Sequence, residues 1–285
     1  MSYYVVIDYK HDNRLRAGLN ALAKETFGLD FEPWYRAGFW DERYVPYSIV
    51  EEDGTVAANV SVNRVTVLAD GKSRNAVMLG TVMCAVPYRG RGYAARLMHT
   101  VLDDCKHSAD FVYLFANETV LDFYPKFGFA EQEERQCILT VQGASLCNER
   151  VVRLDIARQN DLDILRRFIE TGIAAPKRIT VPTNRALILY YCQSGYKDSV
   201  FYYPDSDLLV FLHEGTLLDY YSLAPIPIRD VAARLVPGGQ ELALGFTPME
   251  TQGLTYRYCR YDDHLFITDT GLFTGDFMFP SLSRA

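Results

Sequence analysis

The sequence predicts an α+β fold in which a mixed central sheet is flanked by helices, and it predicts two copies of that fold. Strand-like runs alternate with amphipathic helical segments along the chain. A glycine-rich turn joins a strand to a helix in the first half, and segments of the second half repeat the first in the same order. A length of 285 residues accommodates two domains of moderate size.

The first elements predict a strand, a helix and a hairpin. Residues 3–9 alternate weakly, as a strand does, and residues 12–27 carry leucines at helical spacing. After an irregular aromatic segment come two β-rich runs over 47–51 and 56–62. An Asp-Gly pair, Asp53-Gly54, stands between them, and such a pair between extended runs predicts a hairpin.

The remaining elements of the first half surround the glycine-rich turn. The apolar run 76–86 predicts a central strand before the turn, and the residues from 93 to about 107 predict an amphipathic helix after it. We expect a short buried strand over 111–115, a helix over 119–126 and a closing strand over 137–141. One compact unit would then end near residue 143.

The second half repeats this order of segments. Ala232-Ala233-Arg234-Leu235 stands 138 positions after Ala94-Ala95-Arg96-Leu97, and the same offset places Pro225 on Pro87. A shared order and offset predict a duplicated fold, with domains over 1–143 and 150–285. The second copy lacks the glycine-rich turn, because the positions of Arg89, Gly90 and Gly92 are taken by Pro227, Ile228 and Asp230.

Composition and charge exclude several classes of protein and site. The 29 lysines and arginines against 36 aspartates and glutamates give a net charge of -7, so we expect no nucleic-acid partner. A signal peptide and an 18-residue uncharged stretch are both absent, so we expect a cytoplasmic protein outside the membrane. The cysteines are scattered without metal-ligand spacing, and we expect no metal site. They are Cys84, Cys105, Cys137, Cys147, Cys192 and Cys259.

The segment Arg89-Gly90-Arg91-Gly92-Tyr93-Ala94 predicts an anion site. Glycines let backbone N–H groups converge, and the helix N-terminus adds partial positive charge. A plain strand-to-helix turn with surface arginines is the structural alternative. A dinucleotide fingerprint is also formally satisfied by Gly90, Gly92 and Ala95, with Glu118 downstream. The hairpin before the turn and the missing β/α alternation after it argue against that interpretation, whereas a triphosphate loop is excluded by sequence.

These residues resemble the GCN5-related N-acetyltransferase (GNAT) family. Its loop for acetyl-coenzyme A (acetyl-CoA) reads Gln or Arg, two residues, Gly, one residue, then Gly or Ala, and residues 89–94 fit every position. A second block resembles the family too, with Asn117 followed by Phe123-Tyr124, Lys126 and Gly128-Phe129. The duplicated halves resemble the tandem arrangement of the enhanced-intracellular-survival acetyltransferases and mycothiol synthase. The Fem peptidyltransferases are also tandem, but they do not use this loop.

The resemblance implies a GNAT fold, acetyl-CoA as co-substrate and direct attack of an amine on the thioester. It implies that Tyr124 donates a proton as the thiolate leaves. The residues implied in coenzyme binding are Val86, Arg89, Gly90, Arg91, Gly92, Tyr93, Ala94 and Asn117. Val86 would end the strand that pairs with the pantetheine arm, and Asn117 would contact that arm from the next strand.

The general base and the acceptor site stay open at this stage. Glu118, Asp122, water and the terminal carboxylate of Ala285 are candidates for the base, the last only if the second half returns to the first site. Trp34, Trp40 and Glu32 lie in an acidic aromatic segment that suits an amine of a small molecule or peptide. The alternative for that segment is a satellite core. A non-catalytic acyl-CoA sensor and a dinucleotide enzyme are the alternative functions.

Overall fold

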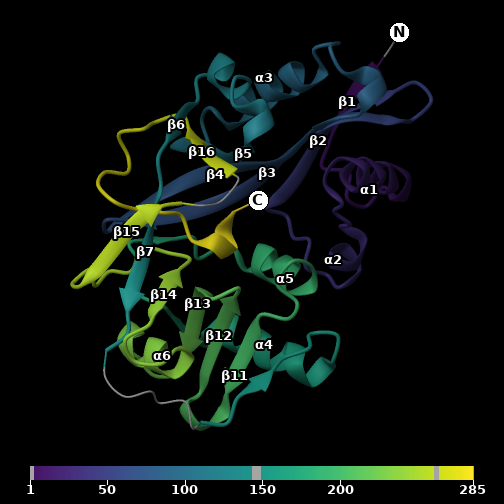
Figure 1. Ribbon diagram of the computed structural model, residues 1–285. Coiled ribbons are helices and arrows are strands. Elements are labelled where there is room, and N and C mark those ends of the chain that lie inside the picture. Colours follow the sequence, from purple (N-terminus) through teal and green to yellow (C-terminus); the bar gives the residue numbers. More distant parts are fainter. Residues whose placement is uncertain (1–2, 143–148, 260–262, 285) are drawn as a thin grey trace.

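The computed structural model describes residues 3–142, 149–259 and 263–284 (Figure 1). It contains two mixed sheets of eight strands, each covered by helices. None of the helices in these ranges has the length and apolar character needed to span a bilayer.

Seven strands of the first sheet follow one another in space from one edge to the other. In this order they are β1 (Tyr3–Ile7), β2 (Tyr44–Glu51), β3 (Val56–Ala69), β4 (Lys72–Cys84), β5 (Phe111–Asn117), β16 (Asp263–Ile267) and β6 (Ala130–Gln132). The eighth, β10 (Ile179–Thr180), pairs with β3.

The second sheet repeats this order, with the corresponding strands of the second half in the corresponding places and an exchanged strand again in the sixth place. From the corresponding edge they are β8 (Val152–Arg153), β11 (Val200–Tyr203), β12 (Leu208–His213), β13 (Thr216–Ser222), β14 (Glu241–Leu244), β7 (Arg135–Thr140) and β15 (Leu254–Tyr258). The short β9 (Ile173–Ala174) pairs with β13. Each sheet has one parallel pair at its fourth and fifth positions, β4 with β5 and β13 with β14. The predicted tandem α+β fold is therefore confirmed.

The sheets exchange strands between the two halves of the chain: besides the short β10, the first sheet takes β16 from the second half, and the second sheet takes β7 from the first half. β16 comes from the second half and pairs antiparallel with β5 and β6, whereas β7 comes from the first half and pairs with β14 and β15 (Figure 1). The strand predicted over 137–141 forms, but placing it at the end of the first unit was wrong. Its partners lie about a hundred residues away, so no local pattern reports them. The bounds 1–143 and 150–285 stay a prediction.

Helices cover both faces of each sheet. They are α1 (Asn13–Phe27), α2 (Glu32–Arg36), α3 (Tyr93–Cys105), α4 (Gln159–Thr171), α5 (Arg185–Gln193) and α6 (Ile228–Leu235). The Asp12 side chain caps α1 by accepting the backbone N–H groups of Arg14 and Leu15 at 2.9 and 3.1 Å. α3 buries Leu97, Met98 and Val101 on one face of the first sheet, and α1 and α2 lie on the other face (Figure 1).

The helix predicted over 119–126 is replaced by two 3-10 turns, Glu118–Val120 and Tyr124–Phe127. Pro125 explains the difference. Its ring disfavours helical backbone at Tyr124, and it has no N–H to donate to the preceding turn. Gly128 then ends the second turn with a φ of 85°.

Candidate active site

A cavity of about 880 Å³ opens where β4 and β5 separate. The two strands pair in parallel from Ala76 and Phe111 to Leu79 and Leu114, and beyond these residues they diverge. The cavity lies between residues 79–84 of β4 and 114–117 of β5. Among the described residues, no strand pairs with 80–84 on this side, so the edge of β4 faces the cavity.

A bulge in β4 shapes this edge. The register between β3 and β4 shifts between Asn59 and Ser61, and Thr81 has a φ of 46°. A β-branched residue in the left-handed region costs on the order of 1–3 kcal/mol, so its surroundings must hold it there. The fully buried side-chain amide of Asn59 donates to the Thr81 carbonyl oxygen and to Ser61 Oγ, both at 2.9 Å. The bulge is therefore braced by a buried polar network.

The glycine-rich turn places free amide donors beside the cavity. Gly90 and Gly92 have φ values of 77° and 79°, which side-chain-bearing residues rarely adopt. Gly92 caps α3 without any side-chain hydrogen bond. In the described part of the chain, no protein acceptor pairs with the backbone N–H groups of Tyr93, Ala94 and Ala95. These donors and the helix dipole form an anion site of the predicted kind.

The side chains of the turn differ in position. Arg89 and Ala94 line the cavity, and Arg89 Nε donates to the Cys84 carbonyl oxygen at 3.2 Å. The Arg91 guanidinium lies 4.9 Å from the Tyr88 ring. The Tyr93 side chain is buried and its hydroxyl donates to Glu51 Oε1 at 2.7 Å, so only its amide faces the turn.

β4 ends earlier than the predicted strand, which was expected to reach Val86. The strand ends at Cys84, and Val86 begins a 3-10 turn, Val86–Tyr88, with 60% of its surface exposed. Val86 does not line the cavity. Pro87 explains the early end, because it lacks the N–H that a longer ladder would use. The open edge that can pair with a ligand is thus 80–84.

Tyr124 and Asn117 both line the cavity. Tyr124 is 5% exposed, and burial raises its pKa to about 12. Its hydroxyl has no hydrogen-bond partner among the described residues, so it is available to a ligand. Asn117 Oδ1 accepts the backbone N–H of Thr119 at 3.0 Å, which holds this side chain at the end of β5.

The second half also contributes to the cavity, through Tyr191, Asp263 and Arg284. No local sequence pattern marks these three residues. The Tyr191 hydroxyl donates to the Arg284 carbonyl oxygen, and the Arg284 guanidinium binds Asp263 and Glu134. The second half therefore does return to the first site, as required for a base near the chain end. Ala285 itself lies outside the described residues.

The three predicted acceptor-binding residues of the acidic aromatic segment do not line this cavity, although Phe27 and Leu29 at the start of that segment do. Trp34 and Trp40 are 3% and 5% exposed, and they belong to a core cluster that joins the two halves. Trp34 Nε1 donates to the Ala186 carbonyl oxygen of α5 at 2.9 Å. The segment is large and apolar enough to form an interdomain core, which is why its aromatic composition did not mark a pocket.

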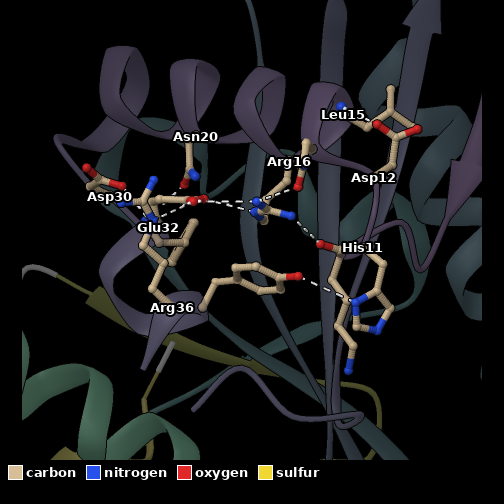
Figure 2. Close-up of polar contacts among 12 residues, drawn as sticks. His11, Asp12, Leu15, Arg16, Asn20, Asp30, Glu32 and Arg36 are labelled. Carbon is tan, nitrogen blue, oxygen red and sulfur yellow. Dashed lines mark hydrogen bonds and ion pairs between the residues drawn. The ribbon is translucent and has the colours of Figure 1, made fainter. Parts of the chain in front are cut away.

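Glu32 is likewise occupied by protein partners (Figure 2). Arg16 Nε donates to one carboxylate oxygen at 2.9 Å and Arg36 Nε to the other at 3.0 Å. The hydrogen bond from Arg16 holds the pKa of Glu32 below its usual range, with Arg36 adding to the effect. Trp34, Trp40 and Glu32 thus lie outside the large cavity, and Trp34 lines a separate void of about 20 Å³.

The other described candidates for the base, Glu118 and Asp122, do not line the cavity. Glu118 and Asp122 are exposed and line a separate shallow depression. No group of three or more potential metal ligands occurs among the described residues. The carboxylate that does line the cavity is Asp263.

Comparison with known proteins agrees with this geometry. Residues 16–131 match the family model of the acetyltransferase (GNAT) domain. A probable N-acyltransferase from Enterococcus faecalis is similar in structure, with a TM-score of 0.60 and 15% identity, covering 94% of this chain and 72% of that one. Eis1 from Mycobacterium abscessus has a TM-score of 0.53 and 15% identity, covering 93% and 73%.

A GCN5-related N-acetyltransferase from Kribbella flavida gives similar values, with a TM-score of 0.53 and 16% identity, covering 93% of this chain and 71% of that one. At such identities the likeness concerns the fold. No curated protein matches the sequence. The family match places a GNAT acetyltransferase domain in the first half of the chain, and the enzyme is an acyltransferase.

Proposed function

We propose that this GNAT-domain protein transfers an acetyl group from acetyl-CoA to a primary amine. The observation that carries the proposal is the cavity between the diverging strands β4 and β5, with the amide donors of the glycine-rich turn beside it. A gap of this kind leaves a strand edge for an extended ligand, and the turn supplies donors for its phosphates.

The residues of the turn would hold the pyrophosphate of the coenzyme. The amides of Tyr93 and Ala94 lack protein acceptors, and Arg89 and Arg91 add positive charge. The edge of β4 over 80–84 would pair with the amide groups of the pantetheine arm, as a sheet edge pairs with a peptide. The fixed bulge at Thr81 would keep that edge in one conformation.

Tyr124 would stabilise the leaving sulfur. The neutral acceptor nitrogen attacks the thioester carbon and releases a proton to water, the carbon–sulfur bond breaks and the sulfur leaves with negative charge. A phenol with a pKa of about 12 stays protonated at neutral pH, so it can donate a hydrogen bond to the thiolate. Because a thiol has a pKa of about 8.5, complete transfer of the phenolic proton would be uphill, and we assign Tyr124 a hydrogen-bonding role.

The test combines binding and turnover. Calorimetry should show binding of acetyl-CoA to the purified protein, and chromatography should show release of CoA with at least one member of a panel of primary amines. Tyr124→Phe should lower kcat about 100-fold while leaving the affinity for acetyl-CoA unchanged, because the phenol acts on the leaving group.

Tyr47→Phe is the matched control. Tyr47 is also buried on the α3 side of the sheet with a pKa of about 12, but it does not line the cavity, so its substitution should leave kcat unchanged. Binding of acetyl-CoA without turnover of any amine would instead indicate a coenzyme sensor. An absence of binding would refute the proposal altogether.

A further inference from the structure

The cavity passes through the first sheet and has two different sides. Side chains of β5 alternate, so Leu114 packs in the cluster with α3 and Tyr124, whereas Phe115 packs against a cluster on the opposite face to which both halves contribute. On β16, Phe266 and Leu265 show the same alternation. Because Asp263 is two residues from Leu265, it shares the face opposite to α3.

The glycine-rich turn and Tyr124 belong to the α3 side. On the opposite side the cavity is lined by the end of α1 and by the second half. The residues there are Thr26, Phe27, Leu29, Tyr191, Asp263 and Arg284. Two reactants can therefore approach the gap from opposite faces of the sheet, the coenzyme from the α3 side and the acceptor from the side of the second half.

Charge distinguishes the acceptor side. Arg284 Nη1 lies 3.2 and 3.3 Å from the two carboxylate oxygens of Asp263, and Nη2 lies 2.7 Å from Glu134 Oε2. Glu134 Oε1 accepts the backbone N–H of Phe279 at 2.7 Å, so both of its oxygens accept hydrogen bonds, while burial raises the pKa of this carboxyl. One guanidinium thus lies between two carboxyl groups, and Arg284, Asp263 and Glu134 form a triad.

The three members of the triad differ in access to the cavity. The side chains of Arg284 and Glu134 are 7% and 4% exposed, whereas that of Asp263 is 31% exposed. Arg284 also stacks on Phe115, with its guanidinium carbon 4.4 Å from the ring centre. Arg284 is therefore fixed, and Asp263 is the member of the triad with the most exposed carboxylate. Among the described residues that line the cavity, Asp263 is the single carboxylate.

We propose that Asp263, held by Arg284 and Glu134, binds the ammonium group of the acceptor, so that the second half of the chain selects the substrate. The inference rests on the proposed acetyl transfer, in which the bound ammonium loses a proton to water before its nitrogen attacks. A cation beside Asp263 would pair with its carboxylate, and the adjoining apolar side chains of Phe27, Leu29 and Tyr191 would contact the hydrocarbon part of an amine.

The experiment compares a charged and an uncharged nucleophile. The wild-type protein is first assayed for acetylation of a panel of primary amines, and the best acceptor is kept together with hydroxylamine, which is uncharged at neutral pH. Asp263→Asn should lower kcat/KM for the cationic amine about 10- to 100-fold, because a hydrogen bond to a charged partner is lost. The rate with hydroxylamine and the affinity for acetyl-CoA should stay unchanged.

Glu131→Gln is the matched control. Glu131 is an exposed residue of β6, and its Oε1 lies 2.7 Å from His264 Nδ1. His264 follows Asp263 in β16, so their side chains lie on opposite faces of that strand. Substitution of Glu131 removes one negative charge near the site but outside the cavity, so kcat/KM for the amine should not change.

The outcomes separate this inference from the proposed function. A wild-type protein that acetylates no amine refutes the proposed function and the inference together. If the wild type does transfer acetyl groups, an Asp263→Asn variant with unchanged kcat/KM for the amine refutes the inference alone. An equal loss with the amine and with hydroxylamine also refutes it, because a general disturbance of the site does not discriminate by charge.

Discussion

The two halves share one strand order, yet the gap between the central parallel strands is open in the first and filled in the second. β13 and β14 pair only at Thr216–Ala243 and Leu217–Leu244, as β4 and β5 pair only up to Leu79 and Leu114. Beyond that point β9 pairs with β13 at Tyr221 and Ser222. The chain's own strand thus occupies the edge that would receive a coenzyme.

Further contacts close the second gap. Lys177 Nζ lies 2.6 Å from Asp219 Oδ2, and their side chains are only 6% and 3% exposed. Ser281 donates its backbone N–H to the Gly245 carbonyl oxygen at 2.7 Å, and a Cβ on Gly245 would come within 2.6 Å of Ser281 Oγ. Residues of β13 past the divergence are therefore buried, whereas Thr81, Val82 and Cys84 of β4 are half-buried.

The N-termini of α3 and α6 also differ, and again the features that suit a ligand occur in the first half. α3 starts after two glycines with amide donors that lack protein acceptors. α6 starts after Pro227, whose carbonyl oxygen accepts the backbone N–H groups of Asp230 and Val231, and Asp230 adds negative charge to the first turn. The second copy therefore lacks the anion site and the open edge of the first among its described residues, and protein contacts occupy the corresponding place.

The largest effect is expected from breaking the buried pair that closes the second gap. Lys177→Met leaves Asp219 buried without its partner, which should lower the free energy of unfolding by about 3–5 kcal/mol. Denaturant titration measures this loss. The double variant Lys177→Met with Asp219→Leu should recover much of it, because no unpaired charge is then buried.

The loss of unfolding free energy in Lys177→Met should be smaller at low pH. Burial already raises the pKa of Asp219, and removal of Lys177 raises it further. A raised carboxyl pKa favours the folded state at low pH and costs stability as pH rises through it, so the deficit of Lys177→Met should be smaller at pH 5 than at pH 8. An equal deficit at both values would contradict the account of a buried charge.

The next effect concerns the anion site of the first half. Gly92→Leu should weaken acetyl-CoA binding by roughly 100-fold, or ~2.7 kcal/mol, because a side chain at a φ of 79° distorts the turn that presents the amides. Calorimetry gives the affinity. Asp230→Leu changes the position of the second copy that aligns with Gly92, and it should leave the affinity unchanged.

The smallest effect is a titration of Tyr124, which faces the open gap. Its pKa is about 12 in the folded protein and about 10 when unfolded, so the folded state keeps a proton that the unfolded state releases between these values. Stability should therefore fall as pH rises from 10 to 12. Tyr124→Phe should remove up to about 1.4 kcal/mol per pH unit of that slope, measured by denaturant titration. An unchanged slope would place the phenol in contact with solvent.

Features that depend on residues adjacent in the chain could be predicted from the sequence. Gly90 and Gly92 require positive φ, and α3 follows from the spacing of Leu97 and Val101, so the anion site could be predicted from adjacent residues. Tyr124 was found by its block after Asn117, and both residues do line the cavity. Even the loss of the anion site in the second copy was visible, because Asp230 stands where a glycine would be needed.

The pairing and packing of segments that lie far apart in the chain could be seen only in the folded structure. β7 and β16 are ordinary short strands in sequence, and their exchange between sheets depends on partners about 100 to 150 residues away. Trp34 and Trp40 became an interdomain core because a large apolar surface on the second half covers them. Asp263 reaches the cavity because β16 pairs with β5. Strand pairing and apolar burial join residues without regard to their separation in the chain, which local spacing cannot encode.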